Sequence, residues 1–383
     1  MTFDPQRRVE LRDVPGTTRN SLSEVVDGAS VLVCCGSGGV GKTTTAAVIG
    51  LEAARGGRRV VVVTIDPARR LADALGLADG LTGEPQRVSV DEAPGSGELW
   101  AMMLDTPAMF ERVVRANAPN AAQADRIVES RFFRNIAGAL SGTQEYMASE
   151  ALHELHDDER FDLVVVDTPP SRNALDFLDA PGVLTRFLEH RAFKLLMMPT
   201  RTGFRVLTVA TQPILKAIGR VVGSDVLADA VAFFQAFAGM DVGFRQRAEA
   251  VTALLRADTT RFILVASPQR DTLAEAIWFA DQLAGQGFSV HATVINRVHP
   301  RFGEGTVAEA ASRAVAATKR GKFQLAAVWN NLAELRTIAA AERAELTPLL
   351  EQVAGSAVVE VPLLPSDVHD VVALDVLARH LFA

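Results

Sequence analysis

Cysteine is nearly absent from this sequence of 383 residues, and the two that occur, Cys34 and Cys35, are neighbours. Two adjacent cysteines in an apolar run form neither a disulfide framework nor a CxxC zinc site. The sequence also lacks a run of 18 apolar residues, which argues against a membrane-spanning helix. The polar N-terminal stretch has no apolar core typical of a signal peptide. We therefore expect a cytoplasmic protein.

The chain also has no excess of positive charge: its formal net charge is −7 at pH 7. Proteins that bind nucleic acid need a clustered basic surface to neutralise phosphates, so nucleic acid is not the expected main partner. The chain is 48% apolar and 22% charged, which is typical of a globular protein. Its length allows a large hydrophobic core.

Short apolar runs alternate with helical stretches along most of the chain. Seven of these runs predict strands: VLVCC (31–35), VVVVTI (60–65), LWAMML (99–104), FDLVVVD (161–167), RFILVAS (261–267), FSVHATVIN (288–296) and AVVEVPLL (357–364). Apolar strands without polar alternation indicate a mostly parallel sheet that is covered on both faces. We therefore predict an α/β protein with a doubly wound sheet.

The spacing of the predicted strands also suggests the domain organisation. Residues 1–28 are polar and unpatterned, and we expect a flexible N-terminal arm there. The remainder, 29–383, is expected to be a single domain. Two connections, 105–160 and about 181–258, are longer than one crossover helix needs. Because both have helical patterns, we interpret them as helical insertions on one side of the sheet.

The segment GSGGVGKT (36–43) fits the phosphate-loop pattern GxxxxGK[ST], directly after a predicted strand and at the start of a predicted helix. Its glycines allow backbone amides to surround phosphate groups, helped by the positive end of the helix. In this pattern Lys42 reaches the outer phosphates, and the hydroxyl of Thr43 binds Mg²⁺. The alternative is a glycine-rich turn without a ligand.

Two aspartates follow apolar strands at the sheet edge where ligands bind. Asp167 ends VVVD and is the candidate for holding Mg²⁺ opposite the phosphate loop. Asp66 ends the strand at 60–65 and is the candidate for orienting an attacking water molecule. The alternatives are that Asp167 caps a turn and that Asp66 caps a helix.

Together these motifs resemble the arsenite-pump ATPase (ArsA) family, which includes the ATPases that deliver tail-anchored membrane proteins. The resemblance depends on six motifs in order, from about residue 30 to the end: GSGGVGKTT, DPARRLADAL (66–75), DTPPSRNALDFL (167–178), TTRFILVASPQRDTLAEA (259–276), VINRVHP (294–300) and VPLLPSDVHDVVAL (361–374).

The resemblance implies a nucleotide-gated dimer that hydrolyses ATP with Mg²⁺. It implies that Asp66 activates water, together with Lys42 as a catalytic group, and that Thr43, Asp66 and Asp167 serve the metal. The implied nucleotide-binding residues are Gly36, Ser37, Gly38, Gly39, Val40, Gly41, Lys42, Thr43, Thr44, Asn296, which contacts adenine, and Pro362, which flanks the base. No [NT]-K-x-D guanine motif occurs in the sequence.

The chain departs from the family pattern at three positions. Family loops read GKGGVGKT, and their first lysine reaches the partner's nucleotide, whereas this chain has Ser37 there. Gln269 stands where a glutamate is frequent, and Arg69 replaces the usual histidine. We hypothesise that this chain forms a hetero-dimer with a paralogue that retains the lysine. The alternatives are a slow homodimer, or a dimer in which Arg69 or Arg172 replaces the lysine.

The purpose of hydrolysis depends on the second insertion. It is rich in large apolar residues: Phe187, Phe193, Leu195, Leu196, Met197, Met198, Phe233, Phe234, Phe237 and Met240. These either form a groove for a hydrophobic or membrane-protein client or fill the core of the subdomain. A regulatory ATP-driven switch without a client is the other function class. An arsenite pump is disfavoured, because the insertions contain no cysteine to bind the metalloid.

Overall fold

The computed structural model describes residues 21–66, 68–89, 96–130, 133, 143–170, 174–182, 233, 240–365, 367–368 and 370–382. Within these residues, eight strands form one sheet in the order β3-β4-β2-β5-β1-β6-β7-β8. The strands are β1 (Val31–Gly36), β2 (Arg59–Thr64), β3 (Gln86–Val88), β4 (Glu98–Met103), β5 (Leu163–Asp167), β6 (Thr260–Ala266), β7 (Val290–Val298) and β8 (Ala357–Pro362). All neighbouring pairs are parallel except β3 with β4. The predicted doubly wound α/β fold is confirmed.

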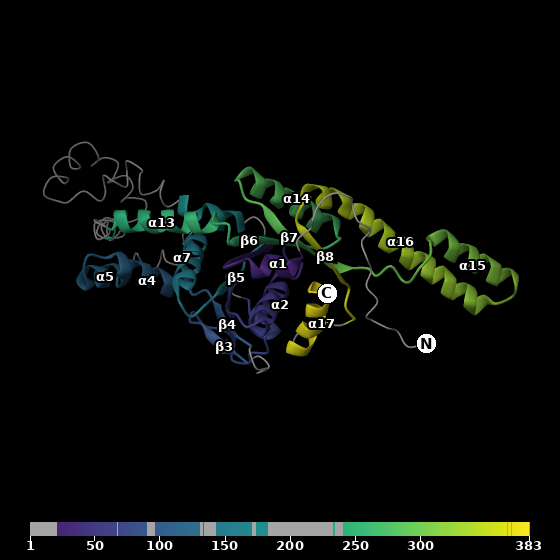
Figure 1. Cartoon of the computed structure of the whole chain (residues 1–383), viewed down its shortest axis with the longest axis horizontal. Coiled ribbons are helices and arrows are strands. Elements are labelled where there is room, and N and C mark those ends of the chain that lie inside the picture. The colour runs from purple at the N-terminus through teal and green to yellow at the C-terminus, as the bar shows by residue number, and fades with distance from the viewer. Residues whose placement is uncertain are drawn as a thin grey trace, which may run out of the picture.

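Helices cover both faces of this sheet (Figure 1). The described helices with full bounds are α1 (Leu22–Asp27), α2 (Lys42–Arg55), α3 (Arg70–Ala74), α4 (Thr106–Asn117), α5 (Ala121–Val128), α7 (Thr143–Asp157), α13 (Asp241–Leu255), α14 (Arg270–Gly285), α15 (Val307–Lys319), α16 (Phe323–Gln352) and α17 (Val371–Leu381). Residues 174–182 are helical as well. None of the helices in the described part of the chain is long and apolar enough to cross a membrane.

Alternate residues of each central strand enter two separate hydrophobic cores. In β1, Val31, Val33 and Cys35 join the core beneath α7, α13, α14 and α16. Leu32 and Cys34 join the opposite core beneath α1, α2, α3 and α17. Because both faces are buried, these strands show continuous apolar runs instead of polar alternation.

Two elements differ from the expectations from sequence. Strand β3 was missed, because its three residues QRV are mostly polar and pair antiparallel with β4 at the sheet edge. The expectation of a flexible arm at 1–28 is wrong for the last of these residues, because Leu22–Asp27 forms helix α1. A capping box between Ser21 and Glu24 begins this helix, and Leu22, Val25 and Val26 are buried against the sheet. Residues 1–20 lie outside the described part.

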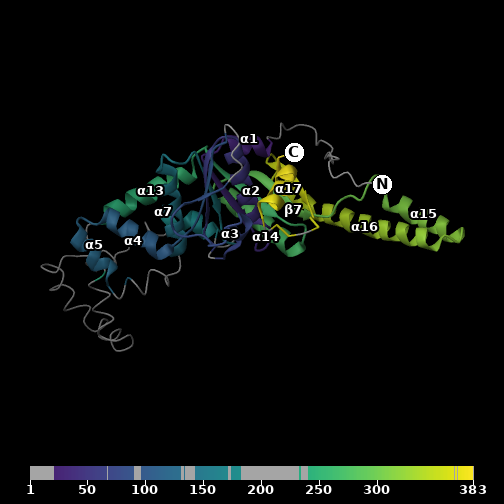
Figure 2. The same ribbon diagram turned by 90° about the horizontal axis from the view of Figure 1, so that it is seen from below.

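Helical extensions lie at both ends of the sheet (Figures 1 and 2). Helices α4, α5 and α7 occupy the described part of the first long connection, and α13 packs beside α7 at the same end. Of the second long connection, 183–232, 234–239 and the side chain of Asp241 lie outside the described residues. At the opposite end, α15 and α16 form a hairpin that extends beyond the sheet.

Candidate functional site

The phosphate loop connects the C-terminal end of β1 to the N-terminus of α2. Gly41 is the N-cap residue of α2 with φ of 98°, and no side chain caps this helix end. A Cβ atom at Gly41 would lie 2.4 Å from Nδ2 of Asn296, so a larger residue does not fit. The uncapped amides and the positive helix end therefore remain free to bind an anion.

The ammonium of Lys42 folds back over this loop. Its Nζ donates a 2.9 Å hydrogen bond to the carbonyl of Ser37, and the side chain is buried. Burial lowers the pKa of Lys42 below its usual value, and nearby Asp167 partly offsets this effect. A neutral carbonyl thus holds a buried cation for which a phosphate oxygen would be a stronger acceptor.

Thr43 and Asp167 meet where α2 begins and β5 ends. Thr43 Oγ1 donates to Asp167 Oδ2 over 2.7 Å, and Thr64 Oγ1 donates to the same oxygen over 2.9 Å. Asp167 is 1% exposed, and its Oδ1 has no hydrogen-bond partner among the described residues. Burial raises the pKa of Asp167 above its usual value, although the two hydroxyls and Lys42 counteract this. The structure therefore brings together Thr43 and Asp167, two of the three residues that were expected from sequence to serve a metal; the third, Asp66, contacts Ala68 and Arg70 instead.

Asp66 lies at the end of the neighbouring strand β2 and is partly exposed. Its Oδ1 accepts a 3.0 Å hydrogen bond from the amide of Ala68, and its Oδ2 lies 3.5 Å from Nη1 of Arg70. The first contact closes a local backbone turn. It is not the helix cap considered as the alternative for Asp66, because α3 has Arg69 as its N-cap residue and no side-chain capping bond. One oxygen is thus used locally, and the other faces an exposed arginine that can move away.

Asn296 and Arg297 contact the phosphate loop from the end of β7. Asn296 Nδ2 donates to the carbonyl of Val40 over 2.8 Å. Arg297 has a left-handed backbone with φ of 62°, and its Nη1 donates to the carbonyl of Gly39 over 3.1 Å. An exposed guanidinium is therefore fixed on the loop itself. Sequence reasoning missed Arg297, although it follows Asn296 directly in the motif VINRVHP.

The remaining residues singled out from sequence lie around this centre. Pro362 ends β8, three strands from β1 in the sheet order, and pairs with Val298. Gln269 is the N-cap residue of α14 without a side-chain capping bond. Arg69 donates to the carbonyl of Ala78 over 3.0 Å. Arg172 and Pro67 lie outside the described residues.

Helix α7 links the Asp66 segment to the helical extension. At its start, Gln144 Nε2 donates to the carbonyl of Ile65 over 3.1 Å, one residue before Asp66. Further along, the buried carboxylate of Glu150 accepts hydrogen bonds from the hydroxyl of Tyr146 and from Nε of Arg247 in α13. The Glu150 side chain is fully buried and that of Arg247 is 31% exposed, so this ion pair joins α7 to α13 at the boundary of the core.

The two cysteines take no part in a binding surface. Cys34 and Cys35 are 0% and 1% exposed within β1, and they face opposite cores. Metalloid binding requires accessible thiolates. Burial raises the pKa of Cys35 to about 12, and it also raises the pKa of Cys34.

The apolar residues proposed for a client groove are only partly described. Phe233 and Met240 are buried, and the Phe233 ring lies 6.4 Å from that of Phe133. These two side chains thus belong to the core of the helical extension. The other eight residues, from Phe187 to Met198 and Phe234 and Phe237, lie outside the described residues.

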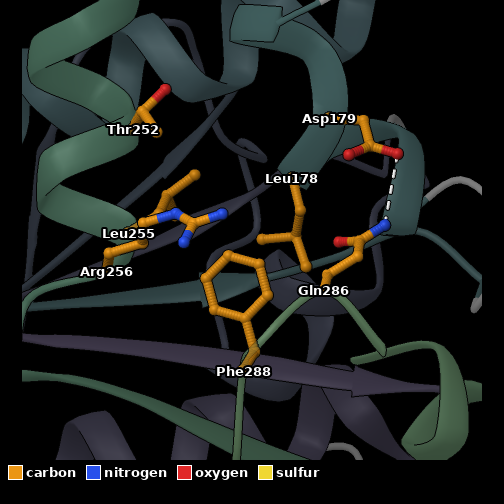
Figure 3. A pocket seen from close by; sticks show the side chains of 7 residues that line it. All are labelled: Leu178, Asp179, Thr252, Leu255, Arg256, Gln286 and Phe288. Carbon is orange, nitrogen blue, oxygen red and sulfur yellow. Dashed lines mark hydrogen bonds between the residues drawn. The ribbon is translucent and has the colours of Figure 1, made fainter. Parts of the chain in front are cut away.

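A small cavity of about 140 Å³ lies near the amino ends of the strands, whereas the phosphate loop lies at their carboxyl ends (Figure 3). It is enclosed by the helix at 174–182, the end of α13 and the segment before β7. Gln286 donates to Asp179 over 3.2 Å, and the guanidinium of Arg256 lies 5.6 Å from the Phe288 ring centroid. Because it lies at the amino ends of the strands, this cavity is separate from the phosphate loop.

The donor atoms at the loop fit a magnesium ion that is bound together with a nucleotide. Mg²⁺ prefers oxygen ligands and is usually held by one or two side chains plus substrate phosphates. Thr43 and Asp167 supply such oxygens, and Asp167 Oδ1 is a buried acceptor without a donor. The described residues contain no group of three or more His, Cys, Asp or Glu that would hold a metal alone.

Comparison with known proteins agrees with this geometry. Residues 29–319 match the model of a family described as anion-transporting ATPase. ATPase GET3 of Malassezia globosa is 27% identical over 282 residues, which cover 73% of this chain and 76% of that protein. Protein SCO2128 of Streptomyces coelicolor is 32% identical over 270 residues, or 70% and 62% of the two chains. The arsenical pump-driving ATPase of Acidiphilium multivorum is 29% identical over 310 residues, 79% of this chain but 44% of that protein.

Proposed function

Because the chain belongs to the anion-transporting ATPase (ArsA) family, we propose that it is an Mg²⁺-dependent ATP hydrolase that works as a nucleotide-gated dimer. The observation that carries this proposal is the contact between Thr43 and Asp167 beside an uncapped helix N-terminus. This arrangement offers amides, a cation and a buried carboxylate to one triphosphate. A glycine-rich turn without a ligand would not require a buried carboxylate with an unpartnered oxygen.

In this proposal the amides of residues 36–43 hold the phosphates, and Lys42 leaves the Ser37 carbonyl for a phosphate oxygen. Thr43 and Asp167 would hold Mg²⁺, which when bound supplies positive charge that neutralises the phosphates. The raised pKa of Asp167 reflects the cost of burying its charge, and a bound cation would remove that cost.

Asp66 is the residue proposed to orient the attacking water. Its carboxylate lies at the same sheet edge as Asp167, on the adjacent strand. To act on water, Oδ2 must exchange the contact with Arg70 at 3.5 Å for a contact with the water molecule. Breaking the contact with Arg70 costs little free energy, because Arg70 is exposed and surface ion pairs are weak.

At position 37 this chain has a serine and therefore lacks the lysine that would reach across the dimer. Ser37 is 1% exposed, and its side chain is too short to reach a partner's nucleotide. We therefore retain the hypothesis of a hetero-dimer with a paralogue that carries the missing lysine. Arg297 offers a second arrangement, because its guanidinium already lies on the Gly39 carbonyl. In a homodimer, Arg297 is therefore our candidate among the described residues to replace the lysine.

The proposed use of hydrolysis is the carriage of a hydrophobic or membrane-protein client, in line with the resemblance to targeting ATPases such as GET3. The connection through Gln144, Glu150 and Arg247 supports this proposal, because it joins the Asp66 segment to the helical extension. Nucleotide-dependent movement at Asp66 would reach α13 by this route. A regulatory switch would use the same connection without a client.

The decisive experiment is isolation of the complex from native cells, followed by mass spectrometry and an ATPase assay. A paralogue with the lysine, recovered with this chain, would support the hetero-dimer, and a hydrophobic passenger would support the carrier. A homodimer with full activity would refute the pairing but not the ATPase. Calorimetry with Mg²⁺ and ATP that gave no heat of binding, alone or in the complex, would refute the proposed function itself.

A further inference from the structure

The hairpin of α15 and α16 extends away from the sheet, opposite the end that carries α4 and α5 (Figures 1 and 2). Its base is firmly attached. Leu346 and Leu349 of α16 are buried. Two carboxylates of the same helix bind the body of the protein: Glu342 Oε1 lies 2.6 Å from Nδ1 of His299, and Glu345 Oε1 lies 2.9 Å from Nε of Arg270. The N-terminal half of α16 and most of α15 therefore project from a rigid support.

Small residues hold the two helices of the hairpin together. Ala310, Ala314 and Ala317 of α15 and Ala326 of α16 are buried at their contact. Arg336 connects the hairpin to the preceding loop by donating to the carbonyls of Thr306 and Phe302. Because alanines fill the contact, the larger apolar side chains of the projecting half are left outside it.

Those larger side chains are concentrated near the turn between the helices. Phe323 is 71% exposed, Val328 62%, Val315 56% and Leu325 45%. Such exposure in neighbouring residues is unusual for a helix surface, since scattered single residues are the rule. Elsewhere the described residues show seven such side chains, but these are spread between residues 242 and 376, whereas the four near the turn fall within 14 consecutive positions.

The same segment is basic in an acidic protein. Residues 310–333 contain Arg313, Lys319, Arg320 and Lys322 and no Asp or Glu, although the whole chain has a net charge of −7. Two of the chain's five lysines flank the turn. The guanidinium of Arg313 lies 4.8 Å from the Trp329 ring centroid, which adds an aromatic side chain to this surface.

We propose that the hairpin tip, residues 313–328, docks on the surface of a membrane that contains anionic lipids. Basic residues interleaved with exposed apolar ones are the chemistry of an interfacial membrane contact. The lysines and arginines bind headgroups while their stems and Phe323 enter the boundary of the acyl chains. A second copy of the hairpin is a poorer occupant, because it would bring four positive charges against four more.

This contact lies on the surface and does not span the bilayer, in agreement with the absence of a spanning helix from the described residues. It is independent of nucleotide turnover, because the tip lies beyond the anchored base of the hairpin and outside the residues assigned to ATP. Each basic residue near an anionic surface contributes roughly fivefold to partitioning, so the tip accounts for reversible binding.

The test is sedimentation of the full chain with vesicles of phosphatidylcholine and phosphatidylglycerol, and with vesicles of phosphatidylcholine alone. We expect binding to the anionic vesicles that weakens with added salt. The double variant Lys319→Glu/Lys322→Glu should bind at least about twentyfold more weakly, and Phe323→Ser about tenfold more weakly. Every variant tested with vesicles is first shown to have the ATPase activity of the unchanged chain.

Matched controls separate the tip from general charge and hydrophobicity. Arg87→Glu/Arg126→Glu reverses two charges elsewhere, and Val372→Ser removes an apolar side chain that is 72% exposed on α17. Both controls should retain binding. The proposal is overturned by equal binding to both kinds of vesicle, by tip variants that bind like the controls, or by no binding at all. Tip-dependent self-association or RNA binding without vesicle binding would also overturn it.

Discussion

The hydroxyl of Thr43 donates a 2.7 Å hydrogen bond to Oδ2 of Asp167 and thereby joins the first turn of α2 to the end of β5. These residues are separated by 124 positions in the sequence. Their contact fixes the distance between the phosphate loop and the carboxylate before any ligand arrives. A site that is preorganised in this way needs little rearrangement to hold a metal and a phosphate together.

Replacing Asp66 by Asn should lower ATP turnover by at least about a hundredfold, the usual contribution of a positioned general base. Binding of ATP should change little, because the phosphate loop is untouched. Steady-state kinetics and calorimetry measure the two effects separately. Asp79→Asn, an exposed aspartate in the loop after α3, serves as the control. If Asp66→Asn turned over like the control, the role of Asp66 would be misassigned.

Replacing Asp167 by Asn should remove Mg²⁺-dependent turnover and raise the melting temperature of the nucleotide-free protein by a few degrees. Burial raises the pKa of Asp167, so the folded protein binds this proton more tightly than the unfolded chain. Stability contributed by this group therefore falls as pH rises from the usual value of 3.8 to the raised pKa. Thermal unfolding at several pH values measures this slope.

In Asp167→Asn that part of the pH dependence should disappear. Asp162→Asn is the matched contrast, because Arg59 lowers the pKa of Asp162. Its carboxylate stabilises the fold at pH values above its usual pKa, and this stability is lost as pH falls through the lowered pKa. Loss of stability in Asp167→Asn at neutral pH would contradict the reasoning.

Replacing Arg297 by Ala should lower turnover of the isolated chain by about tenfold or more, if its guanidinium supplies charge to the transferred phosphate. Arg301→Ala, four residues further along the chain, is the control. Stability should change little, since the Arg297 side chain is exposed. A variant with normal turnover in a verified homodimer would remove Arg297 as the replacement cation and favour the paralogue.

Replacing Arg247 by Met should destabilise the protein by about 3–5 kcal/mol, because it leaves the buried carboxylate of Glu150 without its cation. Chemical unfolding measures the loss. The double variant Glu150→Gln/Arg247→Met removes both charges and should recover much of the stability. If the double variant were as unstable as Arg247→Met alone, the packing of the arginine stem would explain the loss better than the stranded charge.

The sequence was most informative for the buried strands and for the residues around the phosphate loop. Continuous apolar runs predicted seven strands, and the position of Asp167 at the end of one of them predicted that it lies opposite the phosphate loop, where it contacts Thr43. Strand β3 and helix α1 were missed because their residues look polar, and their stability comes from pairing and capping. The family resemblance is confirmed by the family match, whereas the individual roles of Asp66, Asn296 and Pro362 remain predictions.

Arg297 and the hairpin tip show what pattern reasoning leaves out. The position of Arg297 depends on a left-handed backbone at a strand end, which no periodicity encodes. The hairpin reads in sequence as two ordinary alanine-rich helices. Only the three-dimensional arrangement reveals that Phe323 and Val328 have no core to enter.

The burial of both cysteines within β1 is a practical advantage for measuring nucleotide-dependent movements of the helices. Thiol reagents require a thiolate, and Cys34 and Cys35 are inaccessible and hard to ionise. The natural chain is therefore a nearly silent background for maleimide dyes. A single cysteine engineered at the hairpin turn or on α13 would carry a fluorophore there and report distance changes as nucleotide is added.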